Sequence, residues 1–144
     1  MENLSDFQNL LFLSSEHAVE NIIPLGKALG GGAMGMFKAY IVDYFYHEMI
    51  KGSGVIYKEQ RWIPNTIEEI AKELGSSYNE TQQALEILCK KDKVLIAEPL
   101  ANKLNERSLY NEQTLYYTID SKQLLEKYKE QGFLNDNSKN DQPF

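Results

Sequence analysis

The sequence has one cysteine, four prolines and no long hydrophobic run. A lone thiol, Cys89, cannot form an internal disulfide, which is typical of a protein from the reducing cytoplasm. No apolar run approaches the roughly 20 residues that a membrane span needs, and the first residues lack the basic flank of a signal peptide. These absences predict a cytoplasmic protein that does not enter a membrane.

Positive charge is also scarce, because 15 basic residues face 21 acidic ones in a chain of 144 residues, for a net charge of −6. A non-specific polycation binder draws its affinity mainly from neutralising phosphates, so this balance argues against that class. Two thirds of the basic residues nevertheless lie between residues 60 and 131. A local basic surface in that segment is compatible with the composition.

Signatures of catalysis, metal binding and phosphate loops are missing. His17, His47 and Cys89 lack metal-ligand spacing, and we expect each to be a partly buried polar or small apolar residue. The glycine cluster at 30–35 has no preceding strand and no following Gly-Lys-Ser/Thr, so we interpret it as a flexible joint between helices. The carboxylates at 68–69 fall on an exposed helix side, and no nucleophile pairs with a base. We predict a non-enzyme without metal or cofactor.

The first fifty residues are predicted to form three helices. Ser5 and Gln8 match a capping box, and apolar residues at helical spacing predict an N-terminal helix within residues 1–20. Pro24 is expected near the start of a short helix that ends around Leu29. Residues 33–50, the most apolar stretch, predict a central core helix. Its apolar stripe consists of Met36, Phe37, Tyr40, Ile41, Tyr44, Phe45 and Met49.

Two capped helices are predicted next. Thr66 and Glu69 form one capping box, Gly75 ends that helix, and Ser77 with Glu80 opens the second. Two short amphipathic helices joined by a tight glycine-containing turn are a helix-turn-helix unit. The residues expected to face inward are Ile67, Ile70, Ala71, Leu74, Thr81, Ala84, Leu85 and Leu88.

Short β-prone runs surround this unit, at 55–57, 94–96 and 114–119. The last two, joined by a polar loop, predict a β-wing, in which one of Tyr116 and Tyr117 is buried and the other partly exposed. Asp120 or Ser121 caps a closing helix that ends at Gly132. We predict a mainly α fold with a small β-wing: one winged helix-turn-helix domain over residues 1–131, with additional N- and C-terminal helices. The polar stretch 132–144 is predicted to be a disordered tail.

These features resemble the winged-helix N-terminal domains of replisome organisers and replication initiators from phages and plasmids of Gram-positive bacteria (DnaD-like N-terminal domains). The resemblance rests on Lys27-Ala28-Leu29-Gly30, the aromatic helix 40–46, Trp62, the helix pair 66–88, and the tyrosine-rich strand 116–120. It covers roughly residues 20–130. The resemblance implies a role in DNA replication of a phage, plasmid or other mobile element, and self-association as a dimer.

The outer face of the second helix departs from the DNA-reading members, which usually begin this helix with Arg or Lys. Its residues are Tyr78, Asn79, Gln82, Gln83 and Glu86. Asn and Gln can pair with adenine in the major groove, whereas Glu86 and Glu80 repel phosphates. Single-strand binding, protein contact and a merely solvated polar face all stay open.

Cations lie on both sides of the predicted wing. Lys90, Lys91 and Lys93 can hold phosphate, although cations near a helix C-terminus are also favoured by its dipole. In the wing loop, Lys103, Arg107 and Tyr110 suit backbone contact and base stacking, and a mobile polar loop is the alternative. The predicted nucleic-acid-binding residues are therefore Tyr78, Asn79, Gln82, Gln83, Lys90, Lys91, Lys93, Lys103, Arg107 and Tyr110.

The leading hypothesis is a non-enzymatic winged-helix protein that binds DNA, single- or double-stranded, together with replication proteins. An alternative is an acidic protein-interaction adaptor that uses the apolar stripe Leu4, Phe7, Leu10 and Leu11. That stripe can pack on its own domain or on a second subunit. A transcriptional repressor is the third hypothesis, since helix-turn-helix dimers read paired half-sites.

Overall fold

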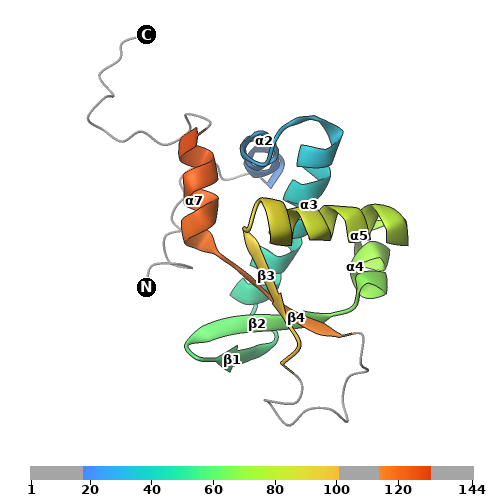
Figure 1. Ribbon diagram of the computed structural model, residues 1–144, viewed down its shortest axis with the longest axis vertical. Helices are drawn as coiled ribbons and strands as arrows, with labels where there is room; N and C mark the ends of the chain where they lie inside the picture. Colours follow the sequence, from blue (N-terminus) through green and yellow to red (C-terminus); the bar gives the residue numbers. More distant parts are fainter. Residues whose placement is uncertain (1–17, 101–113, 131–144) are drawn as a thin grey trace, which may run out of the picture. The chain divides into compact units, whose positions relative to one another are not determined.

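The computed structural model describes residues 18–100 and 114–130 (Figure 1). Its contacts divide the chain into two compact units, residues 40–119 and residues 1–39 with 120–144. Most of the predicted N-terminal helix, the wing loop and the predicted disordered tail lie outside the described residues. The single domain over residues 1–131 stays a prediction.

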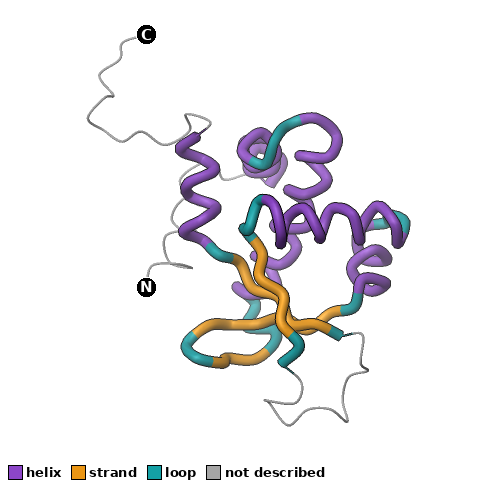
Figure 2. Tube along the Cα trace, viewed as in Figure 1, coloured by secondary structure: helices purple, strands orange, loops and turns teal. Residues whose placement is uncertain are grey.

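The described residues are mostly helical, with one small antiparallel sheet (Figure 2). This agrees with the predicted mainly α class. None of the helices in the described ranges is long and apolar enough to cross a membrane. The elements are α2 (Ala18–Ala28), α3 (Gly32–Ile50), β1 (Val55–Tyr57), β2 (Gln60–Asn65), α4 (Ile67–Leu74), α5 (Tyr78–Glu86), the π-helical turn η1 (Ile87–Lys91), β3 (Leu95–Glu98), β4 (Leu115–Ile119) and α7 (Ser121–Glu130).

The sheet of unit 40–119 has four strands in the order β1-β2-β4-β3, whereas the sequence predicted two strands for the wing. Strand β2 was missed because Pro64 and Asn65 are poor strand formers. Its first half pairs with β1 and its second half with β4, where Ile63 lies opposite Tyr117. Pro64 therefore sits where β2 has a partner on one side only, which is where a strand tolerates the missing N–H.

The tyrosines of β4 correct a second prediction. Tyr116 and Tyr117 are 0% and 2% exposed, although one was expected to be partly exposed. Strand β4 lies between β2 and β3, and the ring of Tyr117 stacks on Phe45 of α3 with centroids 4.9 Å apart. Tyr40, predicted to belong to the buried stripe of the same helix, is instead 50% exposed. The spacing of aromatic residues along a helix does not show which of its faces is covered by other elements.

Helices α4 and α5 confirm both predicted capping boxes. The Thr66 hydroxyl accepts from the Glu69 N–H at 3.1 Å, and the Glu69 carboxylate accepts from the Thr66 N–H at 2.8 Å. Ser77 and Glu80 form the same pair of bonds at the start of α5. Gly75 ends α4 in the left-handed conformation, with φ of 69°. The helix pair is thus fixed by local bonds that the sequence specifies.

The turn between the two helices is fastened by a buried side chain. The Thr81 hydroxyl lies 2.7 Å from the Ser76 hydroxyl and donates to the Ser77 carbonyl at 2.8 Å. Thr81 is fully buried, so these bonds satisfy its hydroxyl. Ile70, Ala71, Ala84 and Leu85 are buried, as predicted for the inward faces.

In the other unit, α2 and α7 are in contact, and α2 corrects the prediction for Pro24. This proline lies inside α2 rather than near its start. Ile22 and Leu25 are 5% and 1% exposed, so burial of this face outweighs the roughly 3 kcal/mol that an interior proline costs. Of the two residues predicted to cap α7, Asp120 is the cap, because its carboxylate accepts from the Gln123 N–H at 3.1 Å.

Candidate nucleic-acid interface

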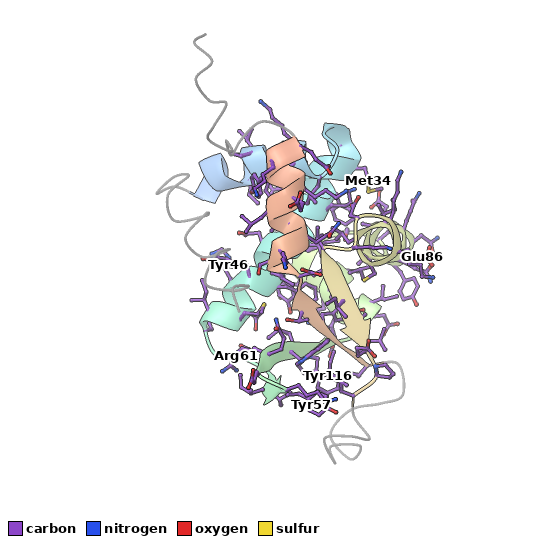
Figure 3. All side chains as sticks on the ribbon, turned by 60° about the vertical axis from the view of Figure 1, so that its left-hand side comes forward. Met34, Tyr46, Tyr57, Arg61, Glu86 and Tyr116 are labelled. Atoms are coloured by element: carbon purple, nitrogen blue, oxygen red, sulfur yellow. The ribbon has the colours of Figure 1, made fainter. Side chains whose placement is uncertain are left out.

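The outer face of α5 presents the predicted base-contacting side chains together. The inward residues Thr81, Ala84 and Leu85 are buried, which turns the remaining positions toward solvent. Glu86 also lies at the periphery of the unit (Figure 3). The exposed residues of this face are Tyr78, Asn79, Gln82, Gln83 and Glu86.

A π-helical turn, which the sequence analysis did not predict, carries the first two lysines. In η1 the Asp92 N–H donates to the Ile87 carbonyl at 2.8 Å, five residues back. Such turns are rare and frequently occur at functional sites. Lys90 and Lys91 belong to η1 and are exposed. The extra residue in this turn changes which side of the helix each lysine occupies.

Lys93 joins η1 to β3 in a left-handed conformation, with φ of 62°. It is exposed, like Lys90 and Lys91. None of the three forms an ion pair with another described residue. Among the residues that the structure describes, no ion pair neutralises these charges, which leaves them able to meet an anionic partner.

Negative charge occupies the same pair of helices. Five exposed carboxylates stand on α4 and α5, and two of them, Glu69 and Glu80, also serve in the capping boxes. Glu68 and Glu73 are on α4, and Glu86 is on α5. The described surface is thus mixed in charge, with its three neighbouring lysines confined to the end of α5 that leads into β3. A phosphate is favoured at that end and disfavoured near α4.

Three predicted contact residues, Lys103, Arg107 and Tyr110, lie outside the described residues. They fall between Glu98, the last residue of β3, and Leu115, the first of β4. These two strands pair with each other, with Ala97 opposite Tyr117.

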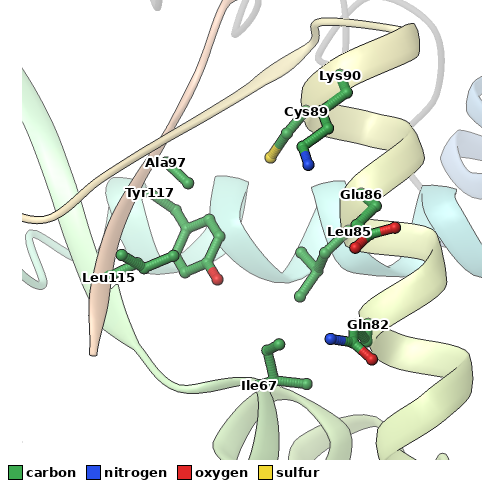
Figure 4. A pocket seen from close by; sticks show the side chains of 9 residues that line it. All are labelled: Ile67, Gln82, Leu85, Glu86, Cys89, Lys90, Ala97, Leu115 and Tyr117. Atoms are coloured by element: carbon green, nitrogen blue, oxygen red, sulfur yellow. The ribbon is translucent and has the colours of Figure 1, made fainter. Parts of the chain in front are cut away.

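Behind α5 lies a cavity of about 180 Å³ that the sequence analysis did not predict (Figure 4). It lies between α5 with η1 and strands β3 and β4, and Ile67 of α4 closes one end. Its lining comes from separate elements, so no spacing in the sequence indicates it. The apolar lining is formed by Ile67, Leu85, Cys89, Ala97, Leu115 and Tyr117, and the polar edge by Gln82, Glu86 and Lys90.

Two groups of the apolar lining, a thiol and a phenol, are neutral near pH 7. Burial raises the pKa of the Cys89 thiol to about 11, with a smaller opposing effect from the Lys90 ammonium. Burial also raises the pKa of the Tyr117 hydroxyl above its ordinary value. A neutral thiol is a poor nucleophile and metal ligand.

The histidine in the described part of the chain corrects an expectation. The side chain of His47 is 59% exposed rather than partly buried, and its Nδ1 lies 2.9 Å from the Asp43 carbonyl and 3.3 Å from its carboxylate. Across residues 18–100 and 114–130, no three His, Cys, Asp or Glu side chains are grouped so as to hold a metal ion.

Comparisons with protein-family models, with curated proteins and with solved structures give no match for this chain.

Proposed function

We propose that this chain is a non-enzymatic winged-helix protein that binds DNA in the cytoplasm and serves replication of a phage, plasmid or other mobile element. The observation that carries the DNA binding is the exposed polar face of α5, followed by three lysines that pair with no acidic group among the described residues. The replication role rests on the sequence resemblance. Replication proteins and a second copy of the chain are its proposed partners.

The topology supports the winged-helix part of this proposal. Strand β2 precedes the helix pair and β3 follows it, and both pair with β4, which returns after the loop. The helix pair thus lies between strands of one small sheet, and residues 99–114 connect β3 to β4. In this arrangement α5 is the recognition helix and the loop is the wing.

Each group of side chains has a different role in the proposed contact. Lys90, Lys91 and Lys93, with Lys103 and Arg107 of the loop, would contact phosphates and set the orientation of the protein. Asn79, Gln82 and Gln83 would meet base edges, while Tyr78 and Tyr110 would stack on bases. With so few cations, affinity should be modest and should fall steeply with salt.

Fluorescence anisotropy with labelled duplex and single-stranded oligonucleotides at low salt tests the proposal. We expect the wild-type chain to bind, and at least a tenfold weaker affinity when Lys90, Lys91 and Lys93 are replaced together by Gln. Each lysine that neutralises a phosphate should contribute about 0.9 to the slope of log affinity against log salt on duplex, or about 0.7 on a single strand. The change in slope between wild type and variant gives the number of phosphate contacts that the lysines make, and the ratio of the wild-type affinities for the two oligonucleotides identifies the preferred form of DNA.

A matched control removes the same charge elsewhere. Lys58, Lys122 and Lys129 are exposed and lie away from α5 in the sequence. Their triple replacement by Gln gives the same net charge as the test variant and should change affinity by less than about threefold. Absence of binding to either oligonucleotide by the wild-type chain would reject the proposal.

The acidic surface of α4 and α5 favours the adaptor as a second candidate. Its five exposed carboxylates suit a basic protein segment better than DNA. An oligolysine peptide serves as the probe: an adaptor should bind it, lose affinity on Glu73→Gln with Glu86→Gln, and bind neither oligonucleotide. A repressor would instead prefer duplexes with two half-sites one helical turn apart.

Self-association is tested on the full chain by light scattering. We expect the mass of a dimer, and the mass of a monomer for a chain that starts at residue 16. The same monomer mass before and after truncation would remove the proposed dimer.

A further inference from the structure

The cavity behind α5 has the properties of a binding site rather than of a packing defect. Its volume is about 180 Å³, and its walls are the apolar side chains of α4, α5, η1, β3 and β4. An enclosed apolar cavity of about 150 Å³ in another protein accepts benzene. This cavity is open to solvent but of comparable volume, so it has room for a single aromatic ring with one small substituent. The exposed side chains of Gln82, Glu86 and Lys90 stand at its edge.

One polar group faces this apolar space. Tyr117 is 2% exposed and lines the cavity, and Figure 4 shows its hydroxyl directed away from β4 toward Leu85 and Ile67. Within the described residues no hydrogen-bond partner is present for this hydroxyl. The hydroxyl is not among the buried, unsatisfied side-chain atoms of the described residues, so it is open to water in the cavity. A ligand that bonds to it would replace water at this oxygen.

The position of the hydroxyl is fixed by the core. The ring of Tyr117 stacks on Phe45, with the two ring planes inclined by 29°, and its backbone pairs with both β2 and β3. A hydrogen-bonding group held in a fixed position in an apolar cavity favours ligands whose polar atom lies where it can bond to that group.

We propose that the cavity binds a small uncharged aromatic molecule that carries one hydroxyl or comparable polar group, with its ring among Leu85, Ala97 and Leu115 and its polar group bonded to Tyr117. A charged ligand is disfavoured because the walls offer no buried counter-charge. The ligand would lie behind α5, but the edge of the cavity shares Gln82 and Lys90 with the proposed DNA-contacting face. Phenol titration without DNA therefore tests the cavity, and oligonucleotide titration without phenol tests the DNA contact. Either proposal can fail without the other.

Phenol is the probe, and toluene, which has nearly the same shape but no hydroxyl, is the matched control ligand. Binding to the full chain is followed by two-dimensional amide NMR titration. We expect phenol to shift the amide signals around Leu85, Cys89 and Ala97, and to bind about three- to tenfold more tightly than toluene. On Tyr117→Phe the phenol affinity should fall to that of toluene, while the toluene affinity stays unchanged.

A filled cavity gives a second test that does not depend on Tyr117. Ala97→Leu places larger apolar bulk in the space and should abolish phenol binding while the melting temperature holds or rises. Undisturbed phenol binding by Ala97→Leu, signal shifts elsewhere in the chain, or an equal preference for phenol and toluene would overturn the proposal. If Tyr117→Phe unfolds, the phenol-to-toluene ratio of the wild-type chain and the Ala97→Leu result still decide it.

Discussion

The ring of Phe45, in the C-terminal half of α3, stacks on the ring of Tyr117, on the inner strand β4, with centroids 4.9 Å apart. Phe45 is fully buried and Tyr117 nearly so. This pair joins a helix to the strand that both β2 and β3 depend on for pairing. It also holds the hydroxyl of Tyr117 at the cavity behind α5. The packing of Phe45 against Tyr117 therefore contributes both to the stability of the sheet and to the shape of the cavity.

Removing the ring of Phe45 should be among the most damaging single changes. Phe45→Ala is expected to lower the free energy of unfolding by about 3–5 kcal/mol, because it leaves a void beneath Tyr117. Urea denaturation followed by circular dichroism measures the loss. Tyr40→Ala, on the same helix but at a 50% exposed position, is the control and should cost far less. Equal losses for the two variants would contradict the packing described.

Gly35 of α3 is required by its close approach to α2. A Cβ at this position would lie 2.6 Å from the carbonyl oxygen of Gly26, a backbone atom that cannot turn away. Gly35→Ala should therefore destabilise the chain by about 1–3 kcal/mol, although alanine is the better helix former by about 1 kcal/mol. Thermal unfolding gives the comparison with Ala33→Gly, an exposed position of the same helix, which should cost about 1 kcal/mol or less. A rise in melting temperature for Gly35→Ala would show that the helices are farther apart.

The hairpin between β1 and β2 turns through two left-handed residues that are not glycine. Lys58 and Glu59 have φ of 52° and 67°. A two-residue hairpin turn of this kind favours Asn-Gly, and each other residue adds strain. Glu59→Gly should raise the free energy of unfolding by about 1 kcal/mol, whereas Glu59→Ala, which keeps the Cβ, should leave it nearly unchanged. The difference between the two variants in urea midpoint is the measurement, and its absence would exclude strain at this turn.

A substitution of Lys93 is expected to change the stability of the fold and the affinity for DNA in opposite directions. Its φ of 62° favours glycine, so Lys93→Gly should stabilise the fold by about 1 kcal/mol. The same change removes one of the proposed phosphate contacts and should weaken DNA binding and lower its salt slope by about one. Lys91→Gln removes a charge from η1 at a residue without a positive φ, and it should weaken binding without stabilising the fold. A Lys93→Gly variant that is more stable and binds unchanged would remove Lys93 from the interface.

The thiol of Cys89 should react slowly. Its pKa of about 11, raised from 9.0 by burial, means that at pH 8 the folded chain holds about a hundredfold less thiolate than a free cysteine does. Alkylation at pH 8 should accordingly be at least that much slower than in urea. Because the folded pKa is the higher one, the stability that the protonated thiol contributes is complete below about pH 9 and is lost as the pH rises through about 11. Alkylation at equal rates in native buffer and in urea would contradict this burial.

Local signals in the sequence predicted the helix pair well. The capping boxes of Thr66 with Glu69 and Ser77 with Glu80 each span three residues, and Gly75 acts on its own helix end. Such bonds form within one turn of chain, so the pattern of residue types carries the information. The same reasoning found β3, β4 and the Asp120 cap to within a residue or two.

The predictions from sequence were wrong where contacts between residues far apart in the chain outweigh the local conformational preference of a segment. Strand β2 was not predicted because Pro64 is a poor strand former, and because the partners of the second half of β2 are residues 115–117, some fifty positions later in the chain. Pro24 stays in a helix whose buried face holds it there, and Tyr116 and Tyr117 are both buried because β4 is an inner strand. No residue pattern within 87–91 indicates the π-helical turn η1.

The amino-acid sequence alone determined that this chain has two capped helices followed by a ribbon, and which side chains of the second helix face outward, because caps and amphipathic spacing act over a few residues. Only the tertiary structure decided that the ribbon is part of a four-stranded sheet, and that Ile67, Cys89, Ala97 and Tyr117 meet around one apolar cavity. Those residues come from four separate elements, and the space between them depends on how whole elements pack, which no local pattern encodes.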